Sequence, residues 1–339
     1  MNYDEIHTET VSDDKTIIEE TVLFFKDGDH AVAKLADAPE EILSVANPVK
    51  NDEVDLSRIK ICGNALSVDS VKAEFREEWL TGKNLPEDLR QDERFKLGVF
   101  LPIPADLVSY QYKVAYRAKN KRNLPTLTYY DENLNSVKRK IKNGENVTVL
   151  LYGDSISNAA NSSGDLNLPP YEKPWYVKAL GKISERYGCK INFINNSRSG
   201  YGSDWGADAV KEKVLPIDCD LFIIAFGMND ATAATPVEKF EKNIRDIANA
   251  KPNSSIILVS SILPNAESDV AFYDLRFNYR RALDKICREK SYALMDMTAI
   301  SEYFIGKKRY AEISGNNFNH PNDFIYNFYT RALYDALNG

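Results

Sequence analysis

The first third of the chain alternates short apolar runs with polar turns. Between residues 110 and 116, tyrosine and valine recur at every second position, which is typical of a strand with one buried face. Similar short runs occupy 21–25, 30–35 and 96–101, and few helical patterns lie between them. We therefore predict that residues 1–122 form a β-sandwich or jelly-roll-like domain.

The pattern changes at residue 123. Asn123-Leu-Pro125 interrupts the strand pattern. Residues 131–142 have the composition of a short helix with basic residues toward its end, and Asn143-Gly144 would terminate it. We expect residues 123–144 to form a linker and a short helix.

From residue 145 onward, short β-type apolar runs alternate with segments of helical length. The runs lie at 147–152, 191–194, 221–226, 256–259 and 292–295, and the helical segments at 175–187, 205–215, 236–250 and 272–289. Short buried strands that alternate with helices predict a parallel sheet covered by helices on both faces. Residues 145–339 are thus expected to form an α/β domain, whose ligand would bind at the carboxyl ends of the strands.

The length and the charge of the chain limit the classes of protein to which it can belong. A chain of 339 residues favours two domains. The net charge of −7 argues against a protein that neutralises nucleic-acid phosphates. Acidic residues stand near the start of the sequence, where a signal peptide would be basic, and no apolar run reaches the roughly 18 residues that span a bilayer. We expect a cytoplasmic protein without nucleic-acid or membrane partners.

The cysteines and known motifs give no sign of a metal or cofactor. Four cysteines are scattered without a CxxC pair, which excludes dense disulfides but leaves one bridge open. The sequence has no HExxH, Walker A or dinucleotide-binding motif. We predict no cofactor and no metal.

Three predicted strands end in glycine and polar residues. The first ends in Gly153-Asp154-Ser155, where glycine permits a tight turn and the following backbone N–H groups could face an anion. Gly200 and Asn229 follow two further strands, at the same edge of the sheet. Turns use these residues for backbone reasons alone. Three strand ends with the same chemistry nevertheless favour a site.

Histidine is the natural activator of a serine hydroxyl, because it accepts a proton near neutral pH. The chain has only three histidines, and His7 and His30 lie in the predicted β domain. His320 is therefore the only candidate in the α/β domain. It stands in a loop directly before the last predicted helix.

Together, these positions resemble the SGNH (GDSL) hydrolases, which are named for Ser, Gly, Asn and His in four blocks. The blocks are similar to 153–156, the Gly200 region, 227–230 and the His320 segment, in the family's order, and the resemblance covers about residues 145–339. It implies a flavodoxin-like three-layer fold, Ser155 as nucleophile and His320 as general base. It also implies an oxyanion hole from the Ser155 and Gly200 N–H groups and the Asn229 side chain.

One position departs from the family pattern. The family usually has aspartate three residues before the histidine, and here that residue is Asn317. Three arrangements are open: the Asn317 amide orients the ring, a backbone carbonyl replaces it and leaves a Ser–His dyad, or Asp323 reaches back to the ring. We favour the first two, because Asp323 is expected to cap or open the final helix.

The substrate is less constrained by the sequence. A β domain joined to an SGNH domain resembles bacterial carbohydrate acetylesterases, and Tyr201 and Trp205 follow Gly200, where aromatic rings could stack on a sugar. Core packing explains Trp205 equally well. We expect an acetylated sugar or oligosaccharide as substrate.

Two other classes remain as alternatives. A lysophospholipase, thioesterase or arylesterase would need an apolar groove, whereas the loop 158–167 is polar. A catalytically silent carbohydrate-binding protein would have no chemical reason to keep Ser155, Gly200, Asn229 and His320 together.

Overall fold

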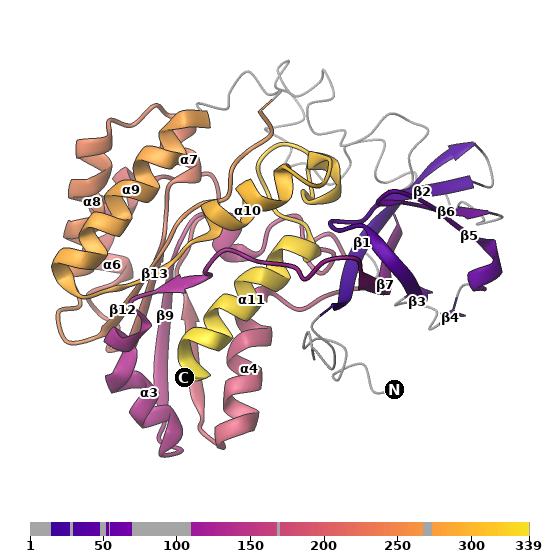
Figure 1. The fold of residues 1–339 in the computed structure, drawn as a ribbon. Helices are drawn as coiled ribbons and strands as arrows, with labels where there is room; N and C mark the ends of the chain where they lie inside the picture. The colour runs from indigo at the N-terminus through magenta and orange to yellow at the C-terminus, as the bar shows by residue number, and fades with distance from the viewer. Residues whose placement is uncertain are drawn as a thin grey trace.

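The computed structural model describes residues 15–27, 30–47, 52–53, 55–69, 110–167, 170–266 and 273–338. They form a strand-rich N-terminal domain and a larger domain in which helices flank a sheet (Figure 1). The strand predicted at 96–101 and His7 lie outside the described residues.

The N-terminal domain is built on an antiparallel sheet. Its described strands have the order β4-β3-β7-β1-β2-β6-β5. They are β1 (Thr16–Asp27), β2 (His30–Lys34), β3 (Pro39–Asn47), β4 (Asp52–Glu53), β5 (Ile59–Cys62), β6 (Ala65–Asp69) and β7 (Tyr110–Ala118). The first part of β1 pairs with β7 and the last part with β2, so that one long strand joins two groups of strands. This strand-rich region fits the separate β domain that we predicted, and its bounds at residues 1–122 stay a prediction.

The second domain has a mostly parallel sheet of order β10-β9-β11-β12-β13-β8. Its strands are β8 (Thr128–Tyr129), β9 (Val147–Gly153), β10 (Ile191–Asn195), β11 (Leu221–Ala225), β12 (Ser255–Val259) and β13 (Ala293–Met295). The five strands from β9 to β13 run parallel in the order 2-1-3-4-5, which is the flavodoxin-like order that we predicted. The short β8 is antiparallel to β13 and comes from the segment that we expected to be a linker.

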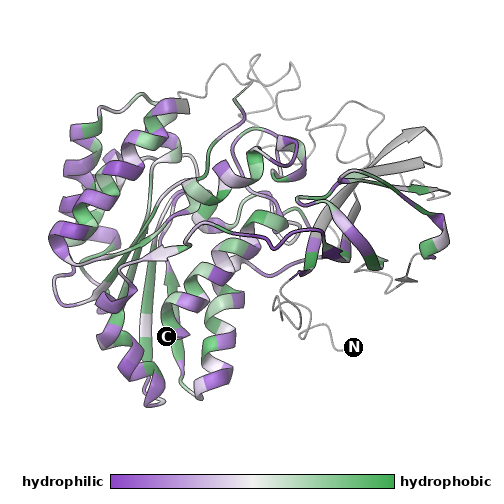
Figure 2. Cartoon of the chain, viewed as in Figure 1, coloured by the Kyte–Doolittle hydropathy of each residue, from purple (hydrophilic) through white to green (hydrophobic). Residues whose placement is uncertain are grey.

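The side chains of β9 alternate between the two faces of the sheet, and each face has its own hydrophobic core. Val149 and Leu151 face one side of the sheet and Leu150 and Tyr152 the other, because successive strand residues point in opposite directions. The first core is covered by α3 (Asn135–Lys142), α4 (Trp175–Tyr187), α10 (Met297–Ile305) and α11 (Asp323–Asn338), and the second by α8 (Val237–Asn249) and α9 (Tyr273–Lys290). Figure 2 shows mainly hydrophobic central strands and helices of mixed character. The three-layer prediction is confirmed.

The helices differ from the prediction where distant contacts intervene. The helix expected at 205–215 is divided into α5 (Ser203–Asp208) and α6 (Val210–Lys213). α5 begins earlier than predicted because the Asp230 carboxylate accepts a hydrogen bond from the Ser203 N–H at 2.9 Å. A 3-10 turn, η4 (Asp131–Leu134), precedes α3, and the short helix α7 (Met228–Thr232) was not predicted.

The cysteines and helices add two observations. Each of the four cysteines is a free thiol, and Cys62 is the exposed one. In the described part of the chain, no helix combines the length and the apolar composition that crossing a membrane requires.

Gly153 ends β9 where there is no space for a side chain. A Cβ atom at this position would lie 2.3 Å from Ser157 Oγ and 2.4 Å from the backbone oxygen of Ala225. We expect Gly153→Ala to lower the free energy of unfolding by about 3 kcal/mol, because the backbone of Gly153 or Ala225 must move to make room for the added Cβ atom. Urea denaturation would measure this loss.

Gly181 provides the matched control. It lies inside α4, and an added Cβ there would meet no atom within 4 Å. Gly181→Ala is expected to stabilise the chain by about 0.5–1 kcal/mol, because alanine favours a helix over glycine. Equal effects of the two substitutions would contradict the steric explanation for Gly153.

Candidate active site

Ser155 is held in the turn that follows β9. The turn leads into a 3-10 segment, η5 (Ile156–Asn158). The Asp154 carboxylate stabilises it by accepting a hydrogen bond from the Ile156 N–H at 2.9 Å. Asp154 is buried, and burial raises its pKa to about 7. The tight connection fixes Ser155 at the carboxyl end of a central strand.

His320 lies directly opposite Ser155. Ser155 Oγ and His320 Nε2 are 2.8 Å apart, within hydrogen-bond distance. The loop around His320 is closed by its own backbone, because the Gly315 N–H donates to the His320 carbonyl at 3.0 Å. The Asn316 side-chain oxygen also accepts the His320 N–H at 3.0 Å. The structure thus brings together the two residues predicted as nucleophile and base.

The other ring nitrogen of His320 contacts Asn161. The Asn161 side-chain oxygen lies within hydrogen-bond distance of His320 Nδ1. An amide oxygen only accepts, so this contact assigns the proton to Nδ1 and leaves Nε2 free to accept from Ser155. Asn161 follows Ser155 in the same loop and has a left-handed backbone, with φ 61°. Sequence reasoning missed it, since Asn161 lies in a polar loop without any motif.

This contact corrects our expectation for Asn317. Asn317 directs its backbone carbonyl to the Asn265 side chain, which donates at 3.0 Å. Asp323 begins α11 and accepts a hydrogen bond from the Ser163 N–H at 2.9 Å, and burial raises its pKa to about 6. Within the described ranges, the partner of the ring is therefore Asn161 rather than Asn317, Asp323 or a backbone carbonyl.

Contacts between loops place Gly200 and Asn229 near the Ser155 turn. The Arg198 N–H donates to the Gly153 carbonyl at 2.9 Å, which ties the loop after β10 to the end of β9. Gly200 has φ 81°, a conformation that favours glycine. The Asn229 side chain donates to the Tyr201 carbonyl at 3.1 Å, next to Gly200. The two predicted oxyanion residues therefore share one edge of the sheet with Ser155.

Buried polar residues stabilise the two loops that carry Gly200 and Asn229. The Asp230 carboxylate accepts the Ser203 N–H, and a Cβ on Gly202 would lie only 3.1 Å from Asp230. Arg276, which is fully buried in α9, donates to the Met228 carbonyl at 3.1 Å. Sequence reasoning did not identify these supports, because they join residues far apart in the chain.

The two predicted sugar-stacking residues differ in exposure. Trp205 packs between Tyr152 and Tyr201, with each pair of ring centroids 5.4 Å apart, and contributes to the core beneath α8. Tyr201 is 38% exposed as a residue, and the guanidinium of Arg198 lies over its ring, 4.0 Å from the ring centroid. Tyr201 is thus the more exposed of the two residues, although the Arg198 guanidinium lies over its ring.

The described residues offer no metal site. No group of three or more His, Cys, Asp or Glu side chains lies close enough to bind a metal ion in these parts of the chain.

The sequence profile of the GDSL-like lipase/acylhydrolase family matches residues 151–327. This match covers just over half of the 339 residues. The chain therefore belongs to the GDSL-like lipase/acylhydrolase family, as its four sequence blocks predicted.

Solved structures share the fold of the second domain. A variant of Axe2, an acetyl-xylooligosaccharide esterase from Geobacillus stearothermophilus, is 19% identical, with a TM-score of 0.50 over 58% of this chain and 97% of that one. The two-domain esterase CEX, active on acetylated mannans, is 20% identical, with a TM-score of 0.48 over 61% of this chain and 54% of CEX. No curated protein sequence gives a significant match. The likeness to Axe2 shows that the second domain has the same fold as that protein.

Proposed function

We propose that the protein is a serine esterase that removes acetyl groups from sugars or oligosaccharides. The observation that carries this proposal is the 2.8 Å contact between Ser155 Oγ and His320 Nε2, with Asn161 at the opposite ring nitrogen. A nucleophile, a base and a group that orients the base are the three parts that acyl transfer through serine requires.

In the first step, Ser155 Oγ attacks the acetyl carbonyl carbon while His320 Nε2 takes the hydroxyl proton. The carbonyl oxygen becomes an oxyanion, for which the Ser155 and Gly200 N–H groups and the Asn229 amide are the proposed donors. Removing one such donor commonly costs about 3 kcal/mol of transition-state stabilisation. His320 then passes its proton to the sugar oxygen, the C–O bond breaks, and the deacetylated sugar leaves an acetyl group on Ser155.

In the second step, water replaces the sugar as the attacking group. His320 takes a proton from the water, whose oxygen attacks the acetyl-enzyme. Collapse of the second tetrahedral intermediate returns the proton to Ser155 Oγ and releases acetate. Asn161 accepts from Nδ1–H in both the neutral ring and the imidazolium, but as a neutral amide it stabilises the imidazolium less than a carboxylate would.

The pH dependence should reflect the environment of His320. Burial lowers the pKa of His320 from 6.5 to about 4. A lower pKa keeps the ring neutral, and therefore able to accept a proton, at lower pH. Because the ring is partly accessible to water, we expect the acid limb of kcat/KM between pH 4 and 6.5. A pH–rate profile at constant ionic strength checks this, and an acid limb above pH 6.5 would contradict it.

The choice of an acetylated sugar rests on the surroundings of Ser155. The loop 158–167 is mostly polar and supplies Asn161 to the site, which is unlike the wall of an acyl-chain groove. The exposed Tyr201 ring lies beside Gly200, where a sugar could stack. The carbohydrate substrates named for Axe2 and CEX agree with this choice.

A substrate panel tests the proposal. Acetate release from acetylated xylo- and manno-oligosaccharides is compared with hydrolysis of aryl esters of increasing acyl length, with Ser155→Ala as the control. We expect the highest kcat/KM on acetylated sugars, and a lower kcat/KM on them after Tyr201→Ala. A preference for long acyl chains would refute the carbohydrate assignment, and activity that survives Ser155→Ala would refute the mechanism.

A further inference from the structure

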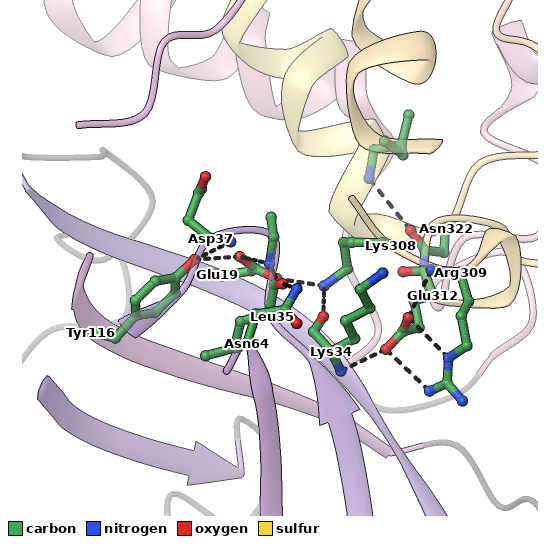
Figure 3. Close-up of polar contacts among 12 residues, drawn as sticks. Glu19, Lys34, Leu35, Asp37, Asn64, Tyr116, Lys308, Arg309, Glu312 and Asn322 are labelled. Carbon is green, nitrogen blue, oxygen red and sulfur yellow. Dashed lines mark hydrogen bonds and ion pairs between the residues drawn. The ribbon is translucent and has the colours of Figure 1, made fainter. Parts of the chain in front are cut away.

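A buried ionic cluster joins the two domains (Figure 3). Glu19 of β1 and Lys308, which follows α10, are both fully buried and form an ion pair. The Glu19 carboxylate also accepts hydrogen bonds from the Tyr116 hydroxyl at 2.8 Å and from Arg122 at 2.9 Å. The cluster thus connects the N-terminal sheet, the segment that follows β7 and the α/β domain.

The charges in this cluster compensate one another. Burial alone would raise the pKa of Glu19, but the positive charges of Lys308 and Arg122 outweigh it and leave the pKa below its ordinary value. Glu19 is therefore ionised. Removing Glu19 would take from the buried Lys308 the carboxylate that balances its charge, so the ion pair favours the arrangement in which the two domains meet.

The backbone of Lys34 provides a second connection. Its N–H donates to Glu312 Oε1 at 2.8 Å, and its carbonyl accepts from the Lys308 side chain at 2.8 Å. Both backbone groups at the end of β2 are thus bound by side chains of the α/β domain. The backbone N–H of Arg309 donates to the other carboxylate oxygen of Glu312, Oε2, at 2.9 Å.

Glu312 stands at the base of the loop that carries His320. Its carbonyl accepts from the Asn322 side chain at 2.9 Å, which joins the two ends of the loop. Ser314 and Pro321 form an isolated β-bridge. Next to it in the loop, the Gly315 N–H donates to the His320 carbonyl at 3.0 Å. A short series of cross-loop contacts therefore leads from the N-terminal domain to His320.

We propose that the N-terminal domain positions His320 through Lys308 and Glu312, which makes it a structural part of the active site. This inference rests on the proposed function for its kinetic consequence only. The contacts of Lys308 and Glu312 with the N-terminal domain hold the start of the loop 313–322 in place. The cross-loop contacts then restrict the position of the His320 ring. Misplacement of a catalytic group by about 1 Å can cost on the order of 10²-fold in rate.

The kinetic test uses the full chain and three variants at the connection. Glu312→Leu loses the contact with Lys34, and Lys308→Met loses the bonds to Glu19 and Lys34. Each is expected to lower kcat at least about tenfold with KM changed less than about twofold. Glu312→Gln keeps an oxygen that can accept from Lys34, so it should recover most of kcat.

Asp220→Asn is the matched control for a general loss of stability. Asp220 accepts the Thr148 N–H at 2.8 Å and pairs with Lys140 at 2.6 Å, at the opposite edge of the sheet from Ser155. It is expected to lower the melting temperature without lowering kcat. A kcat loss in Asp220→Asn equal to that in Glu312→Leu would overturn the positioning role.

Hydrogen exchange of residues 313–322 tests the coupling independently of catalysis. We expect faster exchange in Glu312→Leu and Lys308→Met and unchanged exchange in Asp220→Asn. Unchanged loop exchange and kcat in both interface variants would overturn the inference, while Ser155-dependent hydrolysis would still support the proposed function. Faster loop exchange in a chain that hydrolyses no ester would support the coupling and contradict the proposed function.

Discussion

Replacing His320 with alanine is expected to lower kcat by about 10⁴- to 10⁶-fold. Ser155 Oγ is 2.8 Å from His320 Nε2, and without this ring the hydroxyl keeps its proton and is a poor nucleophile. KM should change little, because the ring contacts the nucleophile. Steady-state rates on the best acetylated substrate, at enzyme concentrations high enough to detect residual turnover, measure the effect.

His30→Ala is the control of the same residue type. His30 lies in β2 of the N-terminal domain, on a strand separate from the Ser155 turn. It should keep kcat within about twofold, as expected for a residue outside the reaction. If His320→Ala retained more than about a tenth of the activity, His320 would not be the general base.

The second large effect is expected at Asn161. Asn161→Ala removes the acceptor at His320 Nδ1, so the ring loses the contact that fixes its tautomer and orientation. We expect kcat to fall on the order of 10²-fold or more, since a mispositioned tautomer in a serine triad is costly. Rates and the melting temperature are measured together.

Asn317→Ala is a matched control for this substitution. Both asparagines have a left-handed backbone, with φ 61° and 54°, so alanine introduces similar strain at each. Of the two asparagines, Asn161 is the one that lies within hydrogen-bond distance of the His320 ring. Equal losses of kcat in the two variants would contradict the role of Asn161.

Asn161→Asp separates orientation from charge. Aspartate keeps an acceptor oxygen and tolerates the left-handed backbone, but its negative charge favours the protonated ring. We expect substantial activity and an acid limb of kcat/KM that moves to higher pH by about 1 unit or more. An unshifted limb would mean that the residue at position 161 does not contact the titrating group.

The sequence was sufficient to predict the parallel sheet and the order of its site blocks. The apolar runs of β9 to β13 are short and separated by helical segments, so local patterns carry the information. β8 was missed because a strand of two residues has no periodicity, and it forms only by pairing with β13. The start of α5 at Ser203, earlier than predicted, also depends on a distant residue, Asp230.

Within the candidate site, the sequence was sufficient to select residues whose type determines their chemistry. Ser155 and His320 could be paired because the α/β domain has a single histidine. Asn161 could not be found in this way, since asparagines are common in loops and its contact requires the loop 154–167 to meet the loop 313–322. The buried pair of Glu19 and Lys308 likewise spans 289 positions, and no local pattern reveals such a contact.

Covalent trapping of Ser155 tests the central claim most directly. The protein is incubated with a fluorophosphonate, which reacts with an activated serine hydroxyl, and the modified peptide is identified by mass spectrometry while acetate release is followed in parallel. We predict a single adduct on Ser155, loss of acetate release in proportion to labelling, and much slower labelling in His320→Ala. An adduct on another residue that abolishes acetate release, or full acetate release from protein labelled at Ser155, would contradict the account.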